Sequence, residues 1–461
     1  MRYTFENFTN IIFVFLEGMI IFSSIVLAMI ITFSLNQSTV SNPSRLFFKI
    51  FIFVLVCQLC LYFNDLYEKK SLKGMKELII RIFQSLGAAE IILLILYFCF
   101  PLTRVGRATF LTSIFVLTMA LVGWRVFFSW VAIQEGLQKN LIVMGGGDLA
   151  RKIIKSTEEY GLNYYALKGT LAEAETAVGQ TLMGIKILGN YQSLKEVVQK
   201  YRIDTIVVAM PDSRGKLPIP QLLEMKLQGI EIEEATSFYE KMTGKIAIEN
   251  LRPSYIIFSE GFRTSGIPEI LKRLLEIILC LLGMLFTLPI FLMIALIIKL
   301  DSSGPIFFKQ KRVGKNGKIF DLYKFRSMKT GAEQESGPVW ARKGDVRFTR
   351  VGKFIRKPRI DEIPQFINVL KGDMTFVGPR PERPYFIEKL KKEIPYYSQR
   401  LMVKPGLTGW AQIKYQYGAS TMESIEKLQY DLYYMKNRSL LFDLTIIFES
   451  IKVILLGKGA V

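Results

Sequence analysis

The chain of 461 residues contains no histidine. Imidazole is the commonest general base in enzymes, and it activates the nucleophile in Ser-His and Cys-His systems. The absence of histidine excludes both systems. Any catalysis by this chain must therefore use other acids, bases and nucleophiles.

Cysteine is scarce, and all four cysteines lie in apolar segments. Cys57 and Cys60 form a C-x-x-C pattern, a spacing found in redox and zinc sites. The pattern lies inside a predicted membrane helix, however, and we interpret these cysteines as small apolar residues that face lipid or neighbouring helices.

Long apolar runs are abundant, since half of the residues are hydrophobic. A helix of about 20 apolar residues is long enough to cross ~30 Å of hydrocarbon. The first run continues without a small-residue cleavage site, so it does not resemble a secretory signal. We predict a four-helix transmembrane domain over residues 1–135. Its four spans are expected near 8–35, 46–63, 78–100 and 108–133.

The net charge of +20 indicates an anionic environment, which for a membrane protein means lipid headgroups and anionic substrates rather than nucleic acid. Basic residues also predict the orientation. The loop with Lys69, Lys70, Lys73 and Lys76 and the basic segment after residue 134 should face the cytoplasm, although Arg104 and Arg107 oppose this mildly.

Residues 136–262 have the pattern of a Rossmann-like α/β domain. The string KNLIVMGGGDLARKIIKS reads as strand, glycine turn and helix, and RIDTIVVAMP near 202–211 reads as a later buried strand. Gly145, Gly147 and Ala150 fit the G-x-G-x-x-G/A spacing of dinucleotide sites. The acidic residue that should follow is not evident in YYALKGTLAEAE. The domain either binds a nucleotide or serves regulation or dimer contacts.

Residues 268–300 form a fifth apolar block, with Pro289 near its centre. Proline removes a helical hydrogen bond and kinks the helix. A straight fifth span would place the Lys- and Arg-rich remainder outside, against the positive-inside tendency. We therefore expect a re-entrant helix broken at Pro289, and the alternative is a kinked span.

Residues 301–461 predict a compact, mostly helical domain. Amphipathic helices are expected at 422–436 and 440–456, and the second of these should lie at the membrane surface or in the core. Cations outnumber acids between Lys309 and Arg359, in a run that is by itself typical of a solvated surface. The cations recur beside turns and apolar residues, as in DLYKFRSM and FVGPRPERP, which favours a phosphate site.

Asp361 and Glu362 are adjacent carboxylates within this cationic region. They precede an expected helix, so they could simply complement its dipole. An ionised carboxylate can also attack phosphorus without a base, and a neighbouring Glu can hold Mg²⁺. Both interpretations fit the spacing.

Four strings resemble the bacterial sugar transferases that move a hexose 1-phosphate from a UDP-sugar to polyprenyl phosphate, the monotopic phosphoglycosyl transferases. The resemblance covers residues 268 to the end, and the preceding helices and α/β domain resemble the larger, exopolysaccharide-type members. The strings are FFKQKRVGKNGKIFDLYKFRSM, IRKPRIDEIPQFINVLKGDMTFVGPRPERP, IPYYSQRLMVKPGLTGWAQIKYQYG and KLQYDLYYMKN.

The resemblance implies a nucleophilic Asp361 and a Mg²⁺ site at Glu362 and Asp361. It also implies substrate-binding residues and a re-entrant helix broken at Pro289. The stretch TGAEQESGPVWARKGD departs from the family pattern and leaves the roles of Arg342 and Arg347 open. The implied substrate-binding residues are Gln310, Lys324, Arg326, Arg356 and Arg380.

The implied reaction transfers hexose 1-phosphate from a UDP-sugar to undecaprenyl phosphate and releases UMP, at the cytoplasmic face of a bacterial inner membrane. The chain would thereby initiate the assembly of an exopolysaccharide or related glycan. The expected partners are the UDP-sugar, undecaprenyl phosphate, the lipid bilayer and a second copy of the chain. One alternative enzyme class is an ordinary nucleotide-sugar glycosyltransferase, but no Asp-x-Asp metal motif is present. The alternative outside enzymes is a membrane-anchored nucleotide-sensing regulator built on Gly145 and Gly147.

Overall fold

The computed structural model describes most of the chain, and it divides into two compact units. One unit comprises Met1–Val143, Ile154–Ile206 and Pro218–Ile232, and the other comprises Met144–Ile153, Val207–Leu217 and Glu233–Val461. The described residues are 3–36, 43–67, 75–133, 138–161, 165–173, 177–210, 217–251, 253–259, 261–262, 267–332, 345–415 and 420–455.

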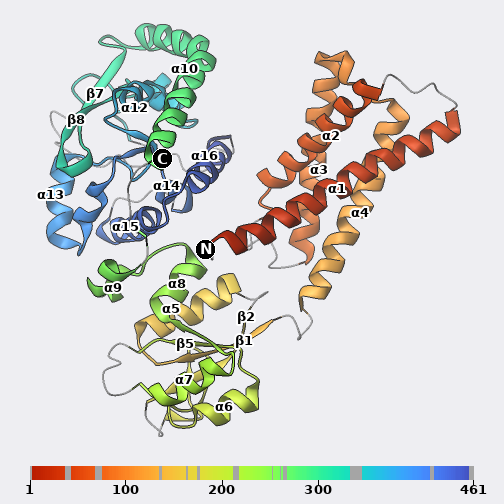
Figure 1. The fold of residues 1–461 in the computed structure, drawn as a ribbon. Helices are drawn as coiled ribbons and strands as arrows, with labels where there is room; N and C mark the ends of the chain where they lie inside the picture. Colours follow the sequence, from red (N-terminus) through yellow and green to blue (C-terminus); the bar gives the residue numbers. More distant parts are fainter. Residues whose placement is uncertain are drawn as a thin grey trace. The chain divides into compact units, whose positions relative to one another are not determined.

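Each of the four N-terminal apolar blocks is a helix that contains 18 to 22 residues of membrane-spanning hydropathy. Helix α1 packs against α4 and α2, and α3 packs against α2 and α4. Apolar side chains on the opposite faces remain exposed, as bilayer contact requires. The helices are α1 (Tyr3–Asn36), α2 (Pro43–Phe63), α3 (Met75–Cys99) and α4 (Arg107–Ile133) (Figure 1).

A buried ion pair lies inside this bundle. The guanidinium of Arg125 lies 2.6 Å from the carboxylate of Glu17 and donates to the backbone carbonyl of Leu66. Cys57 and Cys60 are buried among the apolar residues of the same core, with free thiols. Their environment fits small apolar packing residues.

The middle segment forms an α/β unit with a six-stranded mixed sheet of order β3-β4-β2-β1-β5-β6. Strand β2 pairs with β4 in parallel, and β3 pairs with β4 antiparallel. The strands are β1 (Lys139–Met144), β2 (Tyr165–Ala172), β3 (Thr181–Leu182), β4 (Ile185–Asn190), β5 (Thr205–Val208) and β6 (Glu231–Glu234). The helices between them are α5 (Asp148–Ser156), α6 (Leu194–Tyr201) and α7 (Ile219–Leu227).

The predicted strand, glycine turn and helix are present as β1, Gly145 and α5. Gly145 has φ +124°, and a Cβ there would lie 2.5 Å from the carbonyl oxygen of Ala209, so the turn requires glycine. Strand β2 ends at Ala172, and Glu173 follows it directly. The string YYALKGTLAEAE does not by itself show where β2 ends, so the acidic residue at the strand end was not evident from the sequence. Nucleotide binding by this domain stays a prediction.

Residues 235–258 pack onto the C-terminal domain through α8 (Ala235–Thr243), the 3₁₀ turn η5 (Ile248–Asn250) and α9 (Pro253–Phe258). The ammonium of Lys436 lies 2.7 Å from the carboxylate of Glu240, and the indole N–H of Trp410 donates to the carbonyl of Gly244. The compact C-terminal unit therefore includes residues before the predicted border at 262.

Helix α10 (Ile267–Asp301) stays helical through Pro289. Figure 1 shows that it bends within its length. Both of its ends contact the same domain. Near the start, Arg273 donates to the carbonyl of Val369, and just beyond the end, Arg326 donates to the carbonyl of Ser302. Only 11% of its apolar window is buried, so most of the helix presents apolar side chains outward. The helix was expected to break at Pro289, but its helical backbone continues through this residue.

The remaining elements form the C-terminal domain, in which the helix expected at 422–436 is α15. Ser420 and Glu423 form a capping box at its start. The elements are β7 (Phe307–Val313), η6 (Lys315–Gly317), β8 (Ile319–Phe325), α11 (Arg350–Arg356), η7 (Ile360–Gln365), α12 (Phe366–Lys371), β9 (Thr375–Val377), α13 (Pro384–Glu393), η8 (Tyr397–Met402), β10 (Gly406–Thr408), α14 (Trp410–Lys414), α15 (Thr421–Lys436) and α16 (Leu440–Leu455).

Helix α16 packs one face into the core through Phe442 and Ile446 and leaves Leu441 and Phe448 exposed. This arrangement fits the sequence-based expectation for 440–456, because one face belongs to the core and the other is free to meet a membrane surface.

A buried polar cluster attaches the start of α10 to the domain. The ammonium of Lys272 lies 2.8 Å from the carboxylate of Asp443 and donates to the hydroxyl of Tyr434, which itself donates to the carbonyl of Val377. The hydroxyl of Thr375 donates to Glu276. Because β9 carries Thr375 and Val377, this cluster fixes the strand that precedes Arg380.

We expect Lys272→Met to lower the free energy of unfolding by about 3 kcal/mol, because it leaves the buried carboxylate of Asp443 without its cation. Unfolding of the detergent-solubilised full chain measures this. The matched control is Lys389→Met, which removes an exposed partner of Glu393 and should cost about 0.5 kcal/mol or less. Equal losses in the two variants would contradict the assignment.

Candidate active site

The antiparallel ribbon of β7 and β8 brings residues far apart in sequence to one face. Gln310 pairs with Leu322, and Phe308 pairs with Lys324. Directly opposed residues share a face, and alternate residues along a strand share it too. Gln310, Arg312 and Lys324 therefore project from the same side of the ribbon.

Asp361 and Glu362 lie in the short 3₁₀ helix η7, between α11 and α12. Arg359, at φ +56°, occupies the left-handed region and turns the chain into η7, and its carbonyl accepts from the N–H of Glu362. Both carboxylates are buried, with 6% and 7% exposure. Acids that only complement a helix dipole have no need of burial, so the structure favours a functional site over that alternative.

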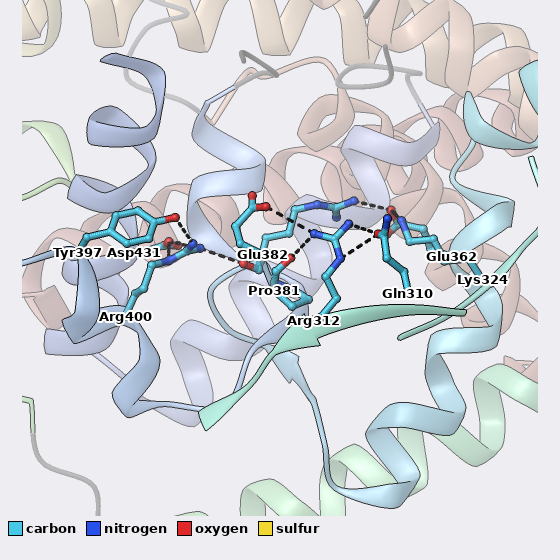
Figure 2. A network of polar contacts seen from close by, with 10 residues as sticks. Gln310, Arg312, Lys324, Glu362, Pro381, Glu382, Tyr397, Arg400 and Asp431 are labelled. Atoms are coloured by element: carbon cyan, nitrogen blue, oxygen red, sulfur yellow. Dashed lines mark hydrogen bonds and ion pairs between the residues drawn. The ribbon is translucent and has the colours of Figure 1, made fainter. Parts of the chain in front are cut away.

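Two cations hold the carboxylate of Glu362 (Figure 2). Its Oε1 accepts from Arg380 Nη2 at 2.7 Å and from Lys324 Nζ at 3.2 Å. Arg380 comes from the loop after β9 and Lys324 from β8. Three separate segments thus meet at this oxygen.

The two carboxylates have opposite pKa shifts. Burial raises the pKa of Asp361, and the neighbouring charge of Glu362 adds to this, while Lys324, Arg356 and Arg380 oppose it. Burial also acts to raise the pKa of Glu362, but Arg380, Lys324 and Arg359 together hold it well below its usual range. As the pH rises, Glu362 therefore loses its proton before Asp361 does.

The site has more positive than negative charge. Lys324, Arg356, Arg359 and Arg380 all act electrostatically on the two carboxylates. The guanidinium of Arg356 also lies over the ring of Phe348, 4.1 Å from its centroid, which orients it. An excess of cations around buried carboxylates suits a phosphate-bearing ligand.

Gln310 belongs to the wall of the site through Arg312. Its Oε1 accepts from Arg312 Nη2 at 2.6 Å and from Nε at 3.1 Å, and Arg312 Nη1 donates to the carbonyl of Pro381. Gln310 thus orients a residue that contacts the loop with Arg380. A direct role in substrate binding stays a prediction.

Arg326 lies elsewhere. Its guanidinium is buried at the end of α10, where it donates to the carbonyls of Ser302 and Ser303. Strand alternation would place Arg326 on the same face as Lys324, but β8 ends at Phe325, so the alternation does not extend to Arg326. We assign Arg326 to capping α10 and leave it out of the proposed phosphate site.

The stretch TGAEQESGPVWARKGD, which departs from the family pattern, lies mostly outside the described residues. Arg342 is one of the residues outside them. Arg347 is described and forms an ion pair with Asp345 at 2.5 Å. This local pair explains Arg347 without a ligand.

Arg400 and Asp431 are buried residues of this network that the sequence analysis did not single out. Arg400 Nη2 donates to the backbone carbonyl of Arg380 at 2.9 Å and lies 2.9 Å from Asp431 Oδ2 (Figure 2). An Arg and an Asp separated by 31 positions carry no local signal of pairing. Their pairing depends on the contact between η8 and α15 in the fold.

The two carboxylates fit a Mg²⁺ site of the kind completed by a substrate. Mg²⁺ is commonly held by one or two carboxylates together with phosphate oxygens and waters. No group of three or more potential ligands occurs among the described residues, so the protein alone offers no complete cage. Asp361 and Glu362 would supply the protein ligands.

Comparisons with known proteins show to which family the chain belongs. A family model described as "Bacterial sugar transferase" matches residues 267–457. The chain is 36% identical to a UDP-glucose:undecaprenyl-phosphate glucose-1-phosphate transferase of Escherichia coli over 73% of this chain and 76% of that protein.

The chain belongs to the bacterial sugar transferase family. It is an enzyme of the phosphoglycosyl transferase class. This sugar transferase is also 42% identical to a UDP-N-acetylgalactosamine-undecaprenyl-phosphate N-acetylgalactosaminephosphotransferase of Aeromonas hydrophila, over 52% of the chain and about half (56%) of that relative. A galactosyl transferase of Streptococcus agalactiae is 28% identical over 93% of the chain and 97% of its own length.

A second family model, described as "CoA-binding domain", matches residues 62–223 of the sugar transferase. This match begins in the last turn of α2, covers α3 and α4, and ends in α7, before the last strand of the α/β unit.

Burial of Asp361 predicts a cost to stability. Its pKa is higher in the folded than in the unfolded chain, so stability falls as pH rises through that interval and stays lower at neutral pH. Asparagine cannot ionise, so Asp361→Asn should raise the Tm by on the order of a few degrees at pH 7 without added Mg²⁺. The gain should fade as pH falls toward about 4.

The control for this measurement is Asp321→Asn, which replaces an exposed carboxylate and should leave the Tm unchanged. A lower Tm of Asp361→Asn at pH 7 would show that the buried charge stabilises the fold.

Proposed function

We propose that this sugar transferase moves a hexose 1-phosphate from a UDP-sugar to undecaprenyl phosphate through a covalent intermediate on Asp361. The observation that carries this proposal is the buried Asp361 beside a cation-bound Glu362. The printed names of the Escherichia coli and Aeromonas hydrophila relatives describe transfers from UDP-sugars to undecaprenyl phosphate.

In the first step, a carboxylate oxygen of Asp361 attacks the β-phosphorus of the UDP-sugar. The bond from this phosphorus to the bridging oxygen breaks, and UMP leaves with the bonding electrons. No proton has to move, because the nucleophile is already an anion. This suits a chain without histidine.

In the second step, a phosphate oxygen of undecaprenyl phosphate attacks the same phosphorus. The aspartyl-phosphate bond breaks, the carboxylate of Asp361 is restored, and undecaprenyl diphosphate sugar is released. Again no base is needed at neutral pH, because the acceptor is an anion. The product would begin the assembly of a glycan.

Lys324, Arg356 and Arg380 support both steps by compensating the negative charge spread over the transferring phosphoryl group. Arg380 is a forked donor for two phosphate oxygens, whereas Lys324 acts as a point charge. In the structure, the Arg380 guanidinium and the Lys324 ammonium both donate hydrogen bonds to the carboxylate of Glu362. Glu362 thus holds the cations in place until an anionic substrate arrives.

A Mg²⁺ ion bound by Glu362 and Asp361 together with the donor phosphates would neutralise the pyrophosphate. This metal role rests on the two adjacent buried carboxylates.

We further propose that α10 enters and leaves the membrane on the cytoplasmic side of a bacterial inner membrane. Both of its ends contact one domain, through Arg273 to Val369 and through Ser302 to Arg326. A straight helix of 35 residues would be about 52 Å long, and its ends would lie on opposite sides of the bilayer. A re-entrant path brings a soluble donor and a lipid acceptor to one site.

We propose the α/β unit as a regulatory or dimer-forming module, because the sugar transferase family model matches residues 267–457, which lie outside it. Nucleotide sensing at Gly145 and Gly147 would then be an additional property rather than the function of the whole chain.

The covalent step predicts a sugar-phosphate adduct on the intact protein when a UDP-sugar is supplied without acceptor. Mass spectrometry of the full chain across a panel of UDP-sugars should detect it, together with an equivalent of UMP. Asp361→Asn should form none and should lose more than about 10³-fold of the turnover.

Glu388→Gln serves as the control for adduct formation, since it changes an exposed carboxylate on α13 and should form the adduct normally. Release of UDP instead of UMP would indicate an ordinary glycosyltransferase. Full turnover by Asp361→Asn would refute the nucleophile.

Metal binding predicts a different effect for Glu362→Gln. This variant should lose about 10²-fold or more of the turnover and should need a higher Mg²⁺ concentration for half-maximal rate, because amide oxygen is a poorer ligand than carboxylate. Titration of Mg²⁺ into EDTA-treated enzyme measures both effects. An unchanged Mg²⁺ dependence would remove Glu362 from the metal site.

A further inference from the structure

The loop that carries Arg380 follows β9 and comprises residues 378–382; we name it the Arg380 loop. Its sequence is Gly-Pro-Arg-Pro-Glu. Pro379 and Pro381 have no backbone N–H, so these two residues can be held in place only through their carbonyls and side chains. The position of the Arg380 guanidinium therefore depends on how the loop carbonyls are bound.

Four successive carbonyls of this loop accept hydrogen bonds. Two of the donors are backbone groups: the N–H of Gly406 donates to Pro379, and the N–H of Val313 donates to Glu382, each at 2.9 Å. The two central carbonyls instead accept from arginine side chains, of which Arg400 is buried and Arg312 is half-buried. Arg400 Nη2 donates to Arg380 at 2.9 Å, and Arg312 Nη1 donates to Pro381 at 2.8 Å.

Arg400 is itself rigidly held. Its Nε donates to Asp431 Oδ2 at 3.1 Å, its Nη1 donates to the hydroxyl of Tyr397 at 2.9 Å, and its Nη2 lies 2.9 Å from Asp431. Arg400 and Asp431 are 7% and 2% exposed. All three guanidinium nitrogens are thus engaged within the protein, so Arg400 acts on the loop rather than on a ligand.

We infer that Arg400 and Asp431 are positioning residues for the transfer reaction. They fix the backbone of Arg380 so that its guanidinium points toward Glu362 and the incoming phosphate. Figure 2 shows the chain of contacts from Asp431 through Arg400 and the Arg380 loop to Glu362. This inference rests on the proposed function, because it assigns a role to Arg380 in that reaction.

Arg312 supports the other side of the same loop. It is oriented by Gln310 and lies 3.5 Å from the Glu382 carboxylate. Because the ribbon of β7 and β8 also carries Lys324, a single rigid element aligns Lys324 with the Arg380 loop. Arg400 provides the corresponding support from η8 and α15.

A double-mutant cycle tests whether Arg400 and Asp431 act through Arg380. Asp431→Asn should lower the single-turnover rate of adduct formation by about 10-fold, because it lets the Arg380 guanidinium shift. Arg380→Ala should lower it by about 10²-fold. In the Arg380→Ala background, Asp431→Asn should cause less than about a 2-fold further loss, since no guanidinium remains to be positioned.

The same cycle with Arg400→Lys in place of Asp431→Asn keeps the test valid if Asp431→Asn fails to fold. A lysine keeps the charge opposite Asp431 but cannot bridge the carboxylate and the carbonyl as a guanidinium does. The matched control is Glu426→Gln. Glu426 lies on α15, the helix that also carries Asp431, but its ion-pair partner is Lys245 and not a residue of the Arg380 loop. The control should retain the full rate, and the Tm of each variant reports its folding.

A full 10-fold loss caused by Asp431→Asn or Arg400→Lys in the Arg380→Ala background would overturn the inference, because the residues would then act independently of Arg380. An unchanged rate of both single variants would also overturn it. Failure of the proposed function is a separate outcome: it would appear as normal adduct formation by Asp361→Asn, whatever the cycle gives.

Discussion

The transferase site depends on the burial of two adjacent carboxylates among cations supplied by other segments. A buried carboxylate is costly unless it is paired, and two of them side by side are costlier still. Lys324 and Arg380 satisfy Glu362, which leaves Asp361 as the carboxylate with the higher pKa. In the proposed mechanism, Glu362 is the charged anchor and Asp361 is the nucleophile.

Much of the C-terminal domain can be understood as support for these cations. The ribbon of β7 and β8 presents Lys324, and strand β9 leads into the Arg380 loop. The cluster around Lys272 joins β9 to the membrane helix α10, so the same strand links the lipid-facing helix to the site. This connection gives a physical reason for a transferase domain to stay attached to an apolar helix.

Several residues that were expected in one site lie together in the structure, while their roles in binding and catalysis stay predictions. Lys324, Arg380 and Arg356 were expected beside Asp361 and Glu362, and the structure brings their charges together. Arg326 was expected there too, but its guanidinium caps α10, because it lies just past the end of β8. Arg400 was missed for the opposite reason: its pairing with Asp431 leaves no local pattern.

Local patterns determined the apolar helices, the glycine turn at Gly145 and the adjacent carboxylates in a chain without histidine, because hydropathy, backbone freedom and residue chemistry are properties of short segments. The tertiary structure decided which cations reach Glu362, where β2 ends before Glu173, and how α10 passes Pro289 without losing its helical form. These outcomes depend on burial and on contacts between distant segments, and the free energy of a buried charge is set by whichever neighbours the fold brings to it.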